Sequence, residues 1–213
     1  MAKLARFWLF YHAIKLLFLK NIKIRVKGLE NIPKNKGFII ACNHEHSWDP
    51  VLIAFAFKRQ IHFLSVYSNY TRVLSGNNLL SSMEKLVFKG SVSGFFLRFT
   101  QQIPVSYTDK LINKEAILKA SHYLKRKEIV GIFPEGELKL KKKRIFPGAA
   151  VIAKRSNAAI LPAHIGTNAP CDSFLKPNFT KVRINIGNPL RFYKSANYTK
   201  KLVMKRVYAL KND

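Results

Sequence analysis

The chain has 213 residues, 48% of them hydrophobic, and it carries 38 Lys and Arg against 11 Asp and Glu, a formal net charge of +27. This length and apolar content suffice for one folded domain and exclude a disordered chain. The positive charge favours an anionic partner: a membrane surface, a nucleic acid or a phosphorylated substrate. Two cysteines, Cys42 and Cys171, make no disulfide framework, which fits a reducing compartment.

The first 20 residues are the most apolar segment of the chain. Phe7, Trp8, Phe10 and Tyr11 cluster there, and Lys and Arg stand at both ends. The uncharged run that holds these aromatic residues is far shorter than the roughly 20 residues that span a bilayer. No cleavage site of a signal peptide follows. We predict that residues 1–20 form a membrane-associating helix whose four aromatic side chains contact lipid; the alternative is a helix that only packs on the core.

Beyond this helix, apolar segments of strand length alternate with segments of helical periodicity. Strands are expected over residues 22–27, 37–42, 60–66, 102–105, 128–133, 159–164 and 181–186. Helices are expected over residues 49–57, 114–127, 148–156 and 198–210. Asp49 and Asn113 are the expected N-caps of the first two, with Pro50 at the first helical position. Residues 68–100 show no clear pattern. The alternation predicts a single α/β domain over residues 21–213, with a mixed, mostly parallel sheet flanked by helices.

A polar stretch from Cys42 to Pro50 separates the second predicted strand from the first of these helices. Loops at the ends of buried strands commonly carry functional residues. His44 and Asp49 are five residues apart, which would place them roughly 140° apart on one helix, but a loop that bends into a helix can bring them together. A carboxylate that holds an imidazole fixes its tautomer and leaves the other nitrogen to take a proton from a hydroxyl. The pair is therefore a candidate general-base dyad.

Two other interpretations of this stretch stay open. Asp49 could be no more than a helix cap, with His44 a polar loop residue. Alternatively, Cys42, His44 and His46 alternate, so an extended chain would place them on one side, where they could bind a metal together with Asp49. This spacing is similar to the His-x-His-x-Asp-His motif of the metallo-β-lactamase hydrolases, but Trp48 stands where their Asp belongs. The remaining histidines are scattered, and we expect no metal.

A second motif, Phe133-Pro-Glu-Gly136, follows the predicted strand 128–133. Together, Asn43-His44-x-x-x-x-Asp49 and this motif resemble the 1-acylglycerol-3-phosphate acyltransferases, the lysophosphatidic acid acyltransferase family. The resemblance covers about residues 20–192. It extends through the segments 28–33, 37–41, 146–150, 160–164 and 186–190.

The resemblance implies transfer of an acyl group from acyl-CoA or acyl carrier protein to the free hydroxyl of a lysophospholipid, with 1-acylglycerol-3-phosphate giving phosphatidate. It implies no further cofactor. His44 would be the base that deprotonates the hydroxyl, and Asp49 would orient it. The sequence does not identify the groups that stabilise the oxyanion.

The resemblance also assigns binding of the acceptor to the second motif, Phe133, Pro134, Glu135 and Gly136. Without the resemblance, Pro-Glu-Gly is typical of a tight turn with Gly at positive φ. Two features depart from the family pattern. Glu-Gly is followed by Glu-Leu-Lys instead of Thr-Arg-Ser, and Tyr107 stands where the family has an Arg after a short Pro-Val strand.

Both missing arginines would normally meet the phosphate of the acceptor, which leaves its head group open. Lys139, Lys141 and Arg144 could supply positive charge instead, and Arg98 is another candidate; the alternative for residues 139–144 is a solvated loop. Equally, the acceptor could be a different lysolipid.

Two classes of function compete with this hypothesis. A catalytically silent relative could bind lipid or carrier, and the charge alone suggests a nucleic-acid binder. The sequence contains no recognition helix, zinc finger or RNA-stacking motif, so we expect no nucleic-acid partner. We expect a bacterial protein held peripherally or monotopically at the cytoplasmic face of a membrane, with its basic residues toward anionic lipid.

Overall fold

The computed structural model describes residues 2–17, 19–66, 100–136, 144–169 and 177–212. The described strands are β1 (Lys23–Lys27), β2 (Phe38–Cys42), β3 (Ile61–Val66), β4 (Ile103–Val105), β5 (Ile129–Ile132), β6 (Ala159–Thr167) and β7 (Lys181–Ile186). The described helices are α1 (Ala2–Leu17), α2 (Asp49–Phe57), α6 (Lys110–Lys125), α7 (Gly148–Ser156) and α8 (Ala196–Ala209), with short 3-10 helices at Leu29–Asn31 (η1) and Leu210–Asn212 (η2). The predicted segment 68–100 lies almost entirely outside the described residues.

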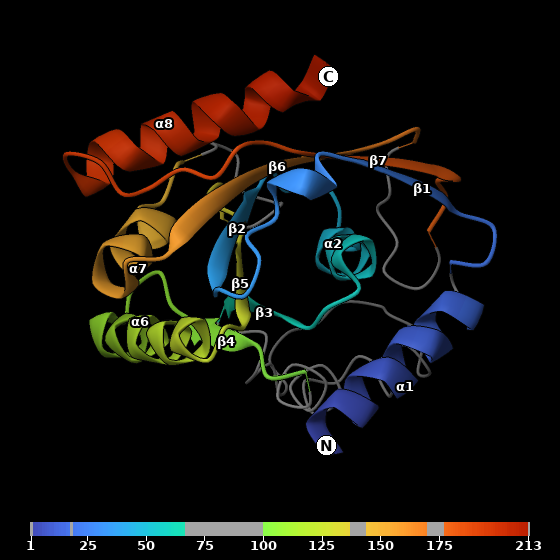
Figure 1. The fold of residues 1–213 in the computed structure, drawn as a ribbon, viewed down its shortest axis with the longest axis horizontal. Helices are drawn as coiled ribbons and strands as arrows, with labels where there is room; N and C mark the ends of the chain where they lie inside the picture. Colours follow the sequence, from blue (N-terminus) through green and yellow to red (C-terminus); the bar gives the residue numbers. More distant parts are fainter. Residues whose placement is uncertain (1, 18, 67–99, 137–143, 170–176, 213) are drawn as a thin grey trace, which may run out of the picture.

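Within these residues the strands form one seven-stranded sheet in the order β1-β7-β6-β2-β5-β3-β4. Every neighbouring pair is parallel except β6 and β7, so β1 and β7 run opposite to the other five strands. Helices α6, α7 and α8 cover one face of the sheet, and α2 covers the other with α1 outside it (Figure 1). The predicted mixed, mostly parallel α/β sheet is confirmed. No helix among the described residues has the length and apolarity that a bilayer span requires.

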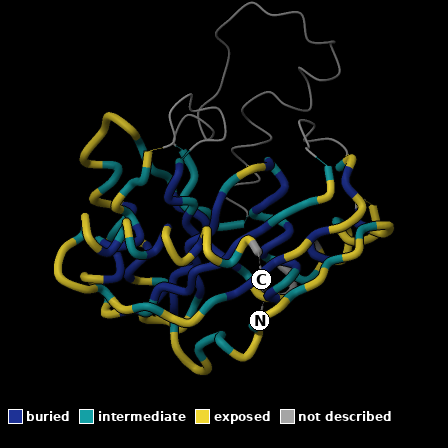
Figure 2. Tube along the Cα trace, turned by 90° about the horizontal axis from the view of Figure 1, so that it is seen from above, coloured by how far each residue is buried: buried dark blue, intermediate teal, exposed yellow. Residues whose placement is uncertain are grey.

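Strand β2 shows why the sequence forms this layered core. All five of its residues are fully buried, because helices cover both faces of the strand. Ile39 and Ala41 pack among residues of α6, α7 and α8. Phe38, Ile40 and Cys42 pack on the other side with residues of α2. In Figure 2 the buried residues gather accordingly in the middle of the molecule, and the exposed ones form its outer rim.

Aromatic residues of the first helix pack against the core of the domain. Tyr11, which we expected to contact the membrane, is buried and stacks on Phe55 of α2 with ring centroids 4.1 Å apart. Trp8 is partly buried against the same core. Leu16 and Leu17 are each 70% exposed. The exposed residues of α1 therefore include leucines together with His12 and Lys15, while Tyr11 faces the protein.

The cap of α6 differs from the prediction. The helix begins at Lys110, and Asp109 is its N-cap, with Oδ1 accepting from the backbone N–H groups of Leu111 and Ile112 at 2.8 and 3.2 Å. Asn113, the expected cap, lies inside the helix. Its side chain accepts from the N–H of Ser106 and donates to the Ser106 carbonyl, at 3.0 and 2.7 Å. Asn113 therefore fixes the preceding loop instead of starting the helix.

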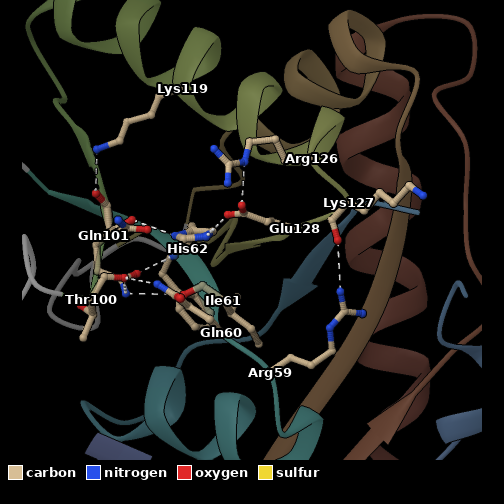
Figure 3. A network of polar contacts seen from close by, with 12 residues as sticks. Arg59, Gln60, Ile61, His62, Thr100, Gln101, Lys119, Arg126, Lys127 and Glu128 are labelled. Atoms are coloured by element: carbon tan, nitrogen blue, oxygen red, sulfur yellow. Dashed lines mark hydrogen bonds and ion pairs between the residues drawn. The ribbon is translucent and has the colours of Figure 1, made fainter. Parts of the chain in front are cut away.

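A polar network around the buried His62 joins the amino-terminal ends of β3 and β5 (Figure 3). His62 Nδ1 lies 3.0 Å from the Gln101 carbonyl oxygen, and Nε2 lies 2.7 Å from Glu128 Oε2. Arg126 pairs with the same carboxylate at 3.0 Å, and Tyr123 stacks on the imidazole. Burial lowers the pKa of His62, against the opposing effects of the carbonyl and the carboxylate. Because the network is at the amino-terminal edge of the sheet, it braces the fold at the edge opposite the two motifs.

Candidate active site

The two sequence motifs meet at one edge of the sheet. Strand β2 ends at Cys42 and β5 ends at Ile132, and the two strands are parallel neighbours with Ala41 opposite Ile132. The loops that follow parallel neighbouring strands leave the sheet at the same edge, which is where ligands bind in α/β folds. Residues 43–48 and 133–136 therefore lie side by side, as the functional prediction requires.

Asn43 fixes the start of the first loop. Its side-chain amide donates to the Ile165 carbonyl at 2.9 Å, and its Oδ1 accepts from the Ile165 N–H at 2.8 Å. The side chain thus continues the pairing with β6 after the backbone of β2 has ended. The position of His44, the next residue, is set by this attachment.

One carboxylate oxygen of Asp49, Oδ2, contacts three residues of the preceding loop. Its Oδ2 accepts from the backbone N–H groups of Glu45 and His46, both at 2.8 Å, and lies 2.9 Å from His44 Nδ1. The residue is fully buried in the first turn of α2, and the N-cap is Trp48. The prediction that Asp49 caps this helix is therefore wrong: its carboxylate turns back to the preceding loop. Its Oδ1 makes no hydrogen bond within the described part of the chain.

The imidazole of His44 is held from two sides. Because a carboxylate can only accept, the contact with Asp49 places the ring proton on Nδ1 and leaves a lone pair on Nε2. One face of the ring stacks on Phe133 with centroids 4.0 Å apart. The side chain is 15% exposed, and Nε2 has no hydrogen-bond partner among the described residues. The geometry presents an unpaired basic nitrogen at the carboxyl-terminal edge of the sheet.

The second motif forms the tight turn that its composition predicts. Gly136 has φ of 83°, a conformation that side chains disfavour, and its N–H donates to the Phe133 carbonyl at 3.0 Å. Glu135 is buried within this turn. Its Oε2 accepts from the backbone N–H of His44 at 2.9 Å, so the two motifs are hydrogen-bonded directly to each other.

A glycine in β5 makes room for the ring stack behind His44. Phe133 stacks on Phe63 of β3, with centroids 5.3 Å apart and ring planes within 6° of parallel. A Cβ atom at Gly131 would lie 2.3 Å from two atoms of the Phe63 ring. The stack from Phe63 through Phe133 to His44 therefore requires glycine at position 131.

The other polar residues of the first motif point to separate partners. Cys42 is buried, and burial, followed by the nearby Asp49 carboxylate, raises the pKa of its thiol well above the usual value. His46 Nε2 lies 2.8 Å from the hydroxyl of Thr167 at the end of β6, and that hydroxyl donates to the Ala169 carbonyl. Among the described residues, no three His, Cys, Asp or Glu side chains form a group that could hold a metal ion.

A known protein family matches most of this chain. The sequence model of the family described as Acyltransferase matches residues 23–166. The chain belongs to this acyltransferase family. The matched residues span both motifs and the strands that carry them, so the family resemblance predicted from the motifs is confirmed.

This acyltransferase is similar to one curated protein in sequence and to one solved structure in fold. A 1-acyl-sn-glycerol-3-phosphate acyltransferase of Bacillus subtilis (strain 168) is 27% identical over 181 residues, covering 84% of this chain and 79% of the relative. The crystal structure of the 1-acyl-sn-glycerophosphate (LPA) acyltransferase, PlsC, from Thermotoga maritima shares the fold, with a TM-score of 0.63 and 21% identity. That match covers 97% of this chain and 77% of the other.

The predicted phosphate-binding residues of this acyltransferase are placed only in part. Arg144 is exposed. Lys139, Lys141 and Arg98 lie outside the described residues. Tyr107, which stands in the place of a family arginine, is 47% exposed and packs against Phe146 with ring centroids 5.4 Å apart. The aromatic residue thus contacts the segment that follows the second motif.

One residue of the site was not found from the sequence of the acyltransferase. Tyr208, in the last turn of α8, donates its hydroxyl to Glu135 Oε1. The two residues are 73 positions apart. No local pattern marks Tyr208, because its role depends on α8 lying across the sheet toward the motif loops; only the fold reveals it.

Proposed function

We propose that the protein transfers a fatty acyl group from acyl-CoA or acyl carrier protein to the free hydroxyl of 1-acylglycerol-3-phosphate, with His44 and Asp49 as the general-base dyad. The observation that carries this proposal is the hydrogen bond of 2.9 Å between His44 Nδ1 and Asp49 Oδ2, which leaves Nε2 without a partner among the described residues. The names of both relatives support the choice of acceptor.

The proposed reaction needs no nucleophile from the protein, because the hydroxyl oxygen of the acceptor attacks the thioester. Nε2 of His44 takes the proton of the acceptor hydroxyl, and the acceptor oxygen attacks the thioester carbonyl carbon. When the tetrahedral intermediate collapses, the C–S bond breaks and His44 returns the proton to the sulfur. The products are the diacyl ester and the free thiol of the carrier. Asp49 holds the Nδ1–H tautomer and balances the charge of the imidazolium between these events.

The acceptor is proposed to bind beside the second motif. Phe133 and Gly136 are partly exposed next to His44, while Pro134 and Glu135 are buried beneath them. In place of the two family arginines, Arg144, Lys139 and Lys141 would bind the phosphate. The two lysines would each contribute a single ammonium group, and Arg144 a guanidinium that can bind two phosphate oxygens.

The acceptor class is tested by offering purified protein one acyl-CoA and, separately, the matching acyl carrier protein. Each donor is combined in turn with lysophosphatidate, lysophosphatidylglycerol and lysophosphatidylethanolamine. We expect phosphatidate as the main product, detected by mass spectrometry, because the relatives are lysophosphatidate acyltransferases. Preferential acylation of another lysolipid would overturn the acceptor proposal. Absence of every diacyl product, with folded protein and both donors, would overturn acyl transfer itself.

We further propose that residues 1–20 hold the acyltransferase domain, residues 21–213, on the cytoplasmic face of a membrane. The exposed leucines of α1, which include Leu9 at 75% and Leu16 and Leu17 at 70%, form an apolar face. The formal charge of +27 adds attraction to anionic lipid.

Substituting Leu16→Ser together with Leu17→Ser should weaken binding to phosphatidylglycerol-containing vesicles by about 30-fold, because each of the two exposed leucines gains roughly 1 kcal/mol when it enters lipid. The matched control is Leu111→Ser with Leu118→Ser, two exposed leucines on α6. Co-sedimentation with vesicles measures both. Equal weakening by the two pairs would remove α1 as the contact.

A further inference from the structure

We propose that Tyr208 and Glu135 are positioning residues: Tyr208 holds the Glu135 carboxylate against the backbone of His44, and so sets the position of the proposed base. The inference rests on the proposed function of His44. It assigns to the C-terminal helix a part in the site that neither sequence motif contains.

The first support is the arrangement at Glu135. The residue is 3% exposed. Its Oε2 accepts from the His44 N–H, and its Oε1 accepts from the Tyr208 hydroxyl. A buried carboxylate is costly unless its oxygens are hydrogen-bonded, so each of these donors stabilises the charged form. The carboxylate therefore bridges the last turn of α8 and the backbone of His44 in the loop of residues 43–48.

The second support is the rigidity of the helix that presents Tyr208. Val203, Met204 and Val207 of α8 are buried against the sheet. Immediately after the helix, the Leu210 carbonyl accepts from the Asn185 side chain of β7 at 2.8 Å. Tyr208 thus projects from a helix that is fixed at the point where it reaches Glu135. A hydroxyl on a fixed support can define the position of the group that it binds.

The third support is that the hydroxyl keeps its proton. Burial and the hydrogen bond to Glu135 raise the pKa of Tyr208 above the ordinary value of tyrosine. The phenol therefore remains a hydrogen-bond donor at neutral pH. The ring of Tyr208 is 44% exposed, so loss of the hydroxyl alone would not disrupt the core.

Together these contacts define how His44 is held. Asp49 holds the Nδ1 edge of the ring, Phe133 holds one ring face, and Glu135 holds the backbone N–H. Without the Tyr208 hydroxyl, the Glu135 carboxylate would lose the hydrogen bond that joins it to α8. A small displacement of a reacting group lowers the rate of the chemical step more than it affects substrate binding.

The test is Tyr208→Phe, which removes only the hydroxyl. We expect kcat to fall by about 5–20-fold with little change in KM for donor or acceptor, as for loss of one hydrogen bond to a charged group. The matched control is Tyr198→Phe, on the same helix, 45% exposed and packed against Tyr193 instead of the motif loops. It should retain the kcat of the wild type.

A double-mutant cycle separates action through Glu135 from a direct role. In the Glu135→Ala background, adding Tyr208→Phe should cause almost no further loss, because the carboxylate that Tyr208 positions is already gone. If Glu135→Ala does not fold, Glu135→Gln takes its place, and the added effect of Tyr208→Phe should be smaller than in the wild type. Independent multiplication of the two losses, or a rise in KM in place of a fall in kcat, would overturn the proposal.

A spectroscopic measurement keeps this inference distinct from the proposed function. The backbone amide resonance of His44 reports its hydrogen bond to Glu135 whether or not a substrate is known. We expect Tyr208→Phe to shift this resonance and Tyr198→Phe to leave it unchanged. An unshifted resonance would overturn the positioning role even in an active enzyme. A shifted resonance in a protein that transfers no acyl group would support the contacts from Tyr208 through Glu135 to His44 and would overturn only the proposed reaction.

Discussion

Replacing His44 with Ala is expected to lower kcat for acyl transfer by about 10²–10⁴-fold, the range that a positioned general base contributes. The substitution removes Nε2 of His44, the nitrogen that the geometry presents to a substrate hydroxyl. The Asp49 carboxylate keeps its two backbone donors from Glu45 and His46, so the loop retains its main supports. Steady-state rates of diacyl lipid formation, with unfolding followed in parallel, give the measurement.

The matched control for this substitution is His122→Ala. His122 is an exposed histidine near the end of α6, and its removal should leave kcat at the wild-type value. If His44→Ala keeps more than about a tenth of wild-type activity, the general-base role of His44 is excluded, because that loss is smaller than general-base catalysis contributes.

Replacing Asp49 with Ala should reduce activity as severely and should also destabilise the fold, by about 2–4 kcal/mol. The carboxylate is fully buried, and its Oδ2 is the acceptor for two backbone N–H groups as well as the imidazole. Without it, these donors, of which the His46 N–H is buried, lose their partner. The free energy of unfolding in urea measures the loss of stability, and an unfolding free energy equal to that of the wild type would contradict this account of the loop.

Asp49→Asn separates the charge of this residue from its hydrogen bonds. The amide oxygen can occupy the place of Oδ2 and accept from the same three N–H groups, and the amide nitrogen takes the place of Oδ1, which has no hydrogen-bond partner among the described residues. We therefore expect a folded protein whose kcat is lower by about 10–10²-fold, since a hydrogen bond to a charged acceptor is stronger than one to a neutral acceptor. Wild-type kcat in this variant would mean that Asp49 acts only as a structural acceptor.

The sheet and its motif loops were predictable because their signals are local. Strand β2 is a continuous apolar run, and β5 runs directly into Phe133-Pro-Glu-Gly136, so strand and loop could be read together. Parallel pairing of β2 and β5 then brings the two loops to one edge of the sheet.

The predicted helix caps and one predicted strand end were wrong, because they depend on contacts with distant residues or on a choice between competing caps. Asp109 and Asn113 are both good caps, and their sequence does not reveal that Asn113 bonds to Ser106 instead. Asp49 precedes a proline as a cap would, yet its carboxylate binds three donors on its N-terminal side. Strand β6 continues to Thr167, beyond its predicted end, because β7 pairs with residues 163–167 from the other side.

The acceptor could not be predicted for a different reason. The two family arginines that would identify a phosphate are absent, and Tyr107, in one of their places, packs against Phe146. Chemistry that depends on one residue pair can be read from a motif, whereas recognition of a head group depends on side chains from several segments. The base was therefore easier to infer than the substrate.

Gly131, inside the sheet, restricts which substitutions the surroundings of His44 can accept. The aromatic stack behind His44 fits because this residue has no Cβ atom to meet the Phe63 ring. Any larger residue at this position would displace Phe63, and the displacement would pass through Phe133 to the base. A substitution of Gly131 would therefore require compensating substitutions at Phe63 and Phe133. Through this steric dependence, a residue without a side chain restricts which residues can surround His44.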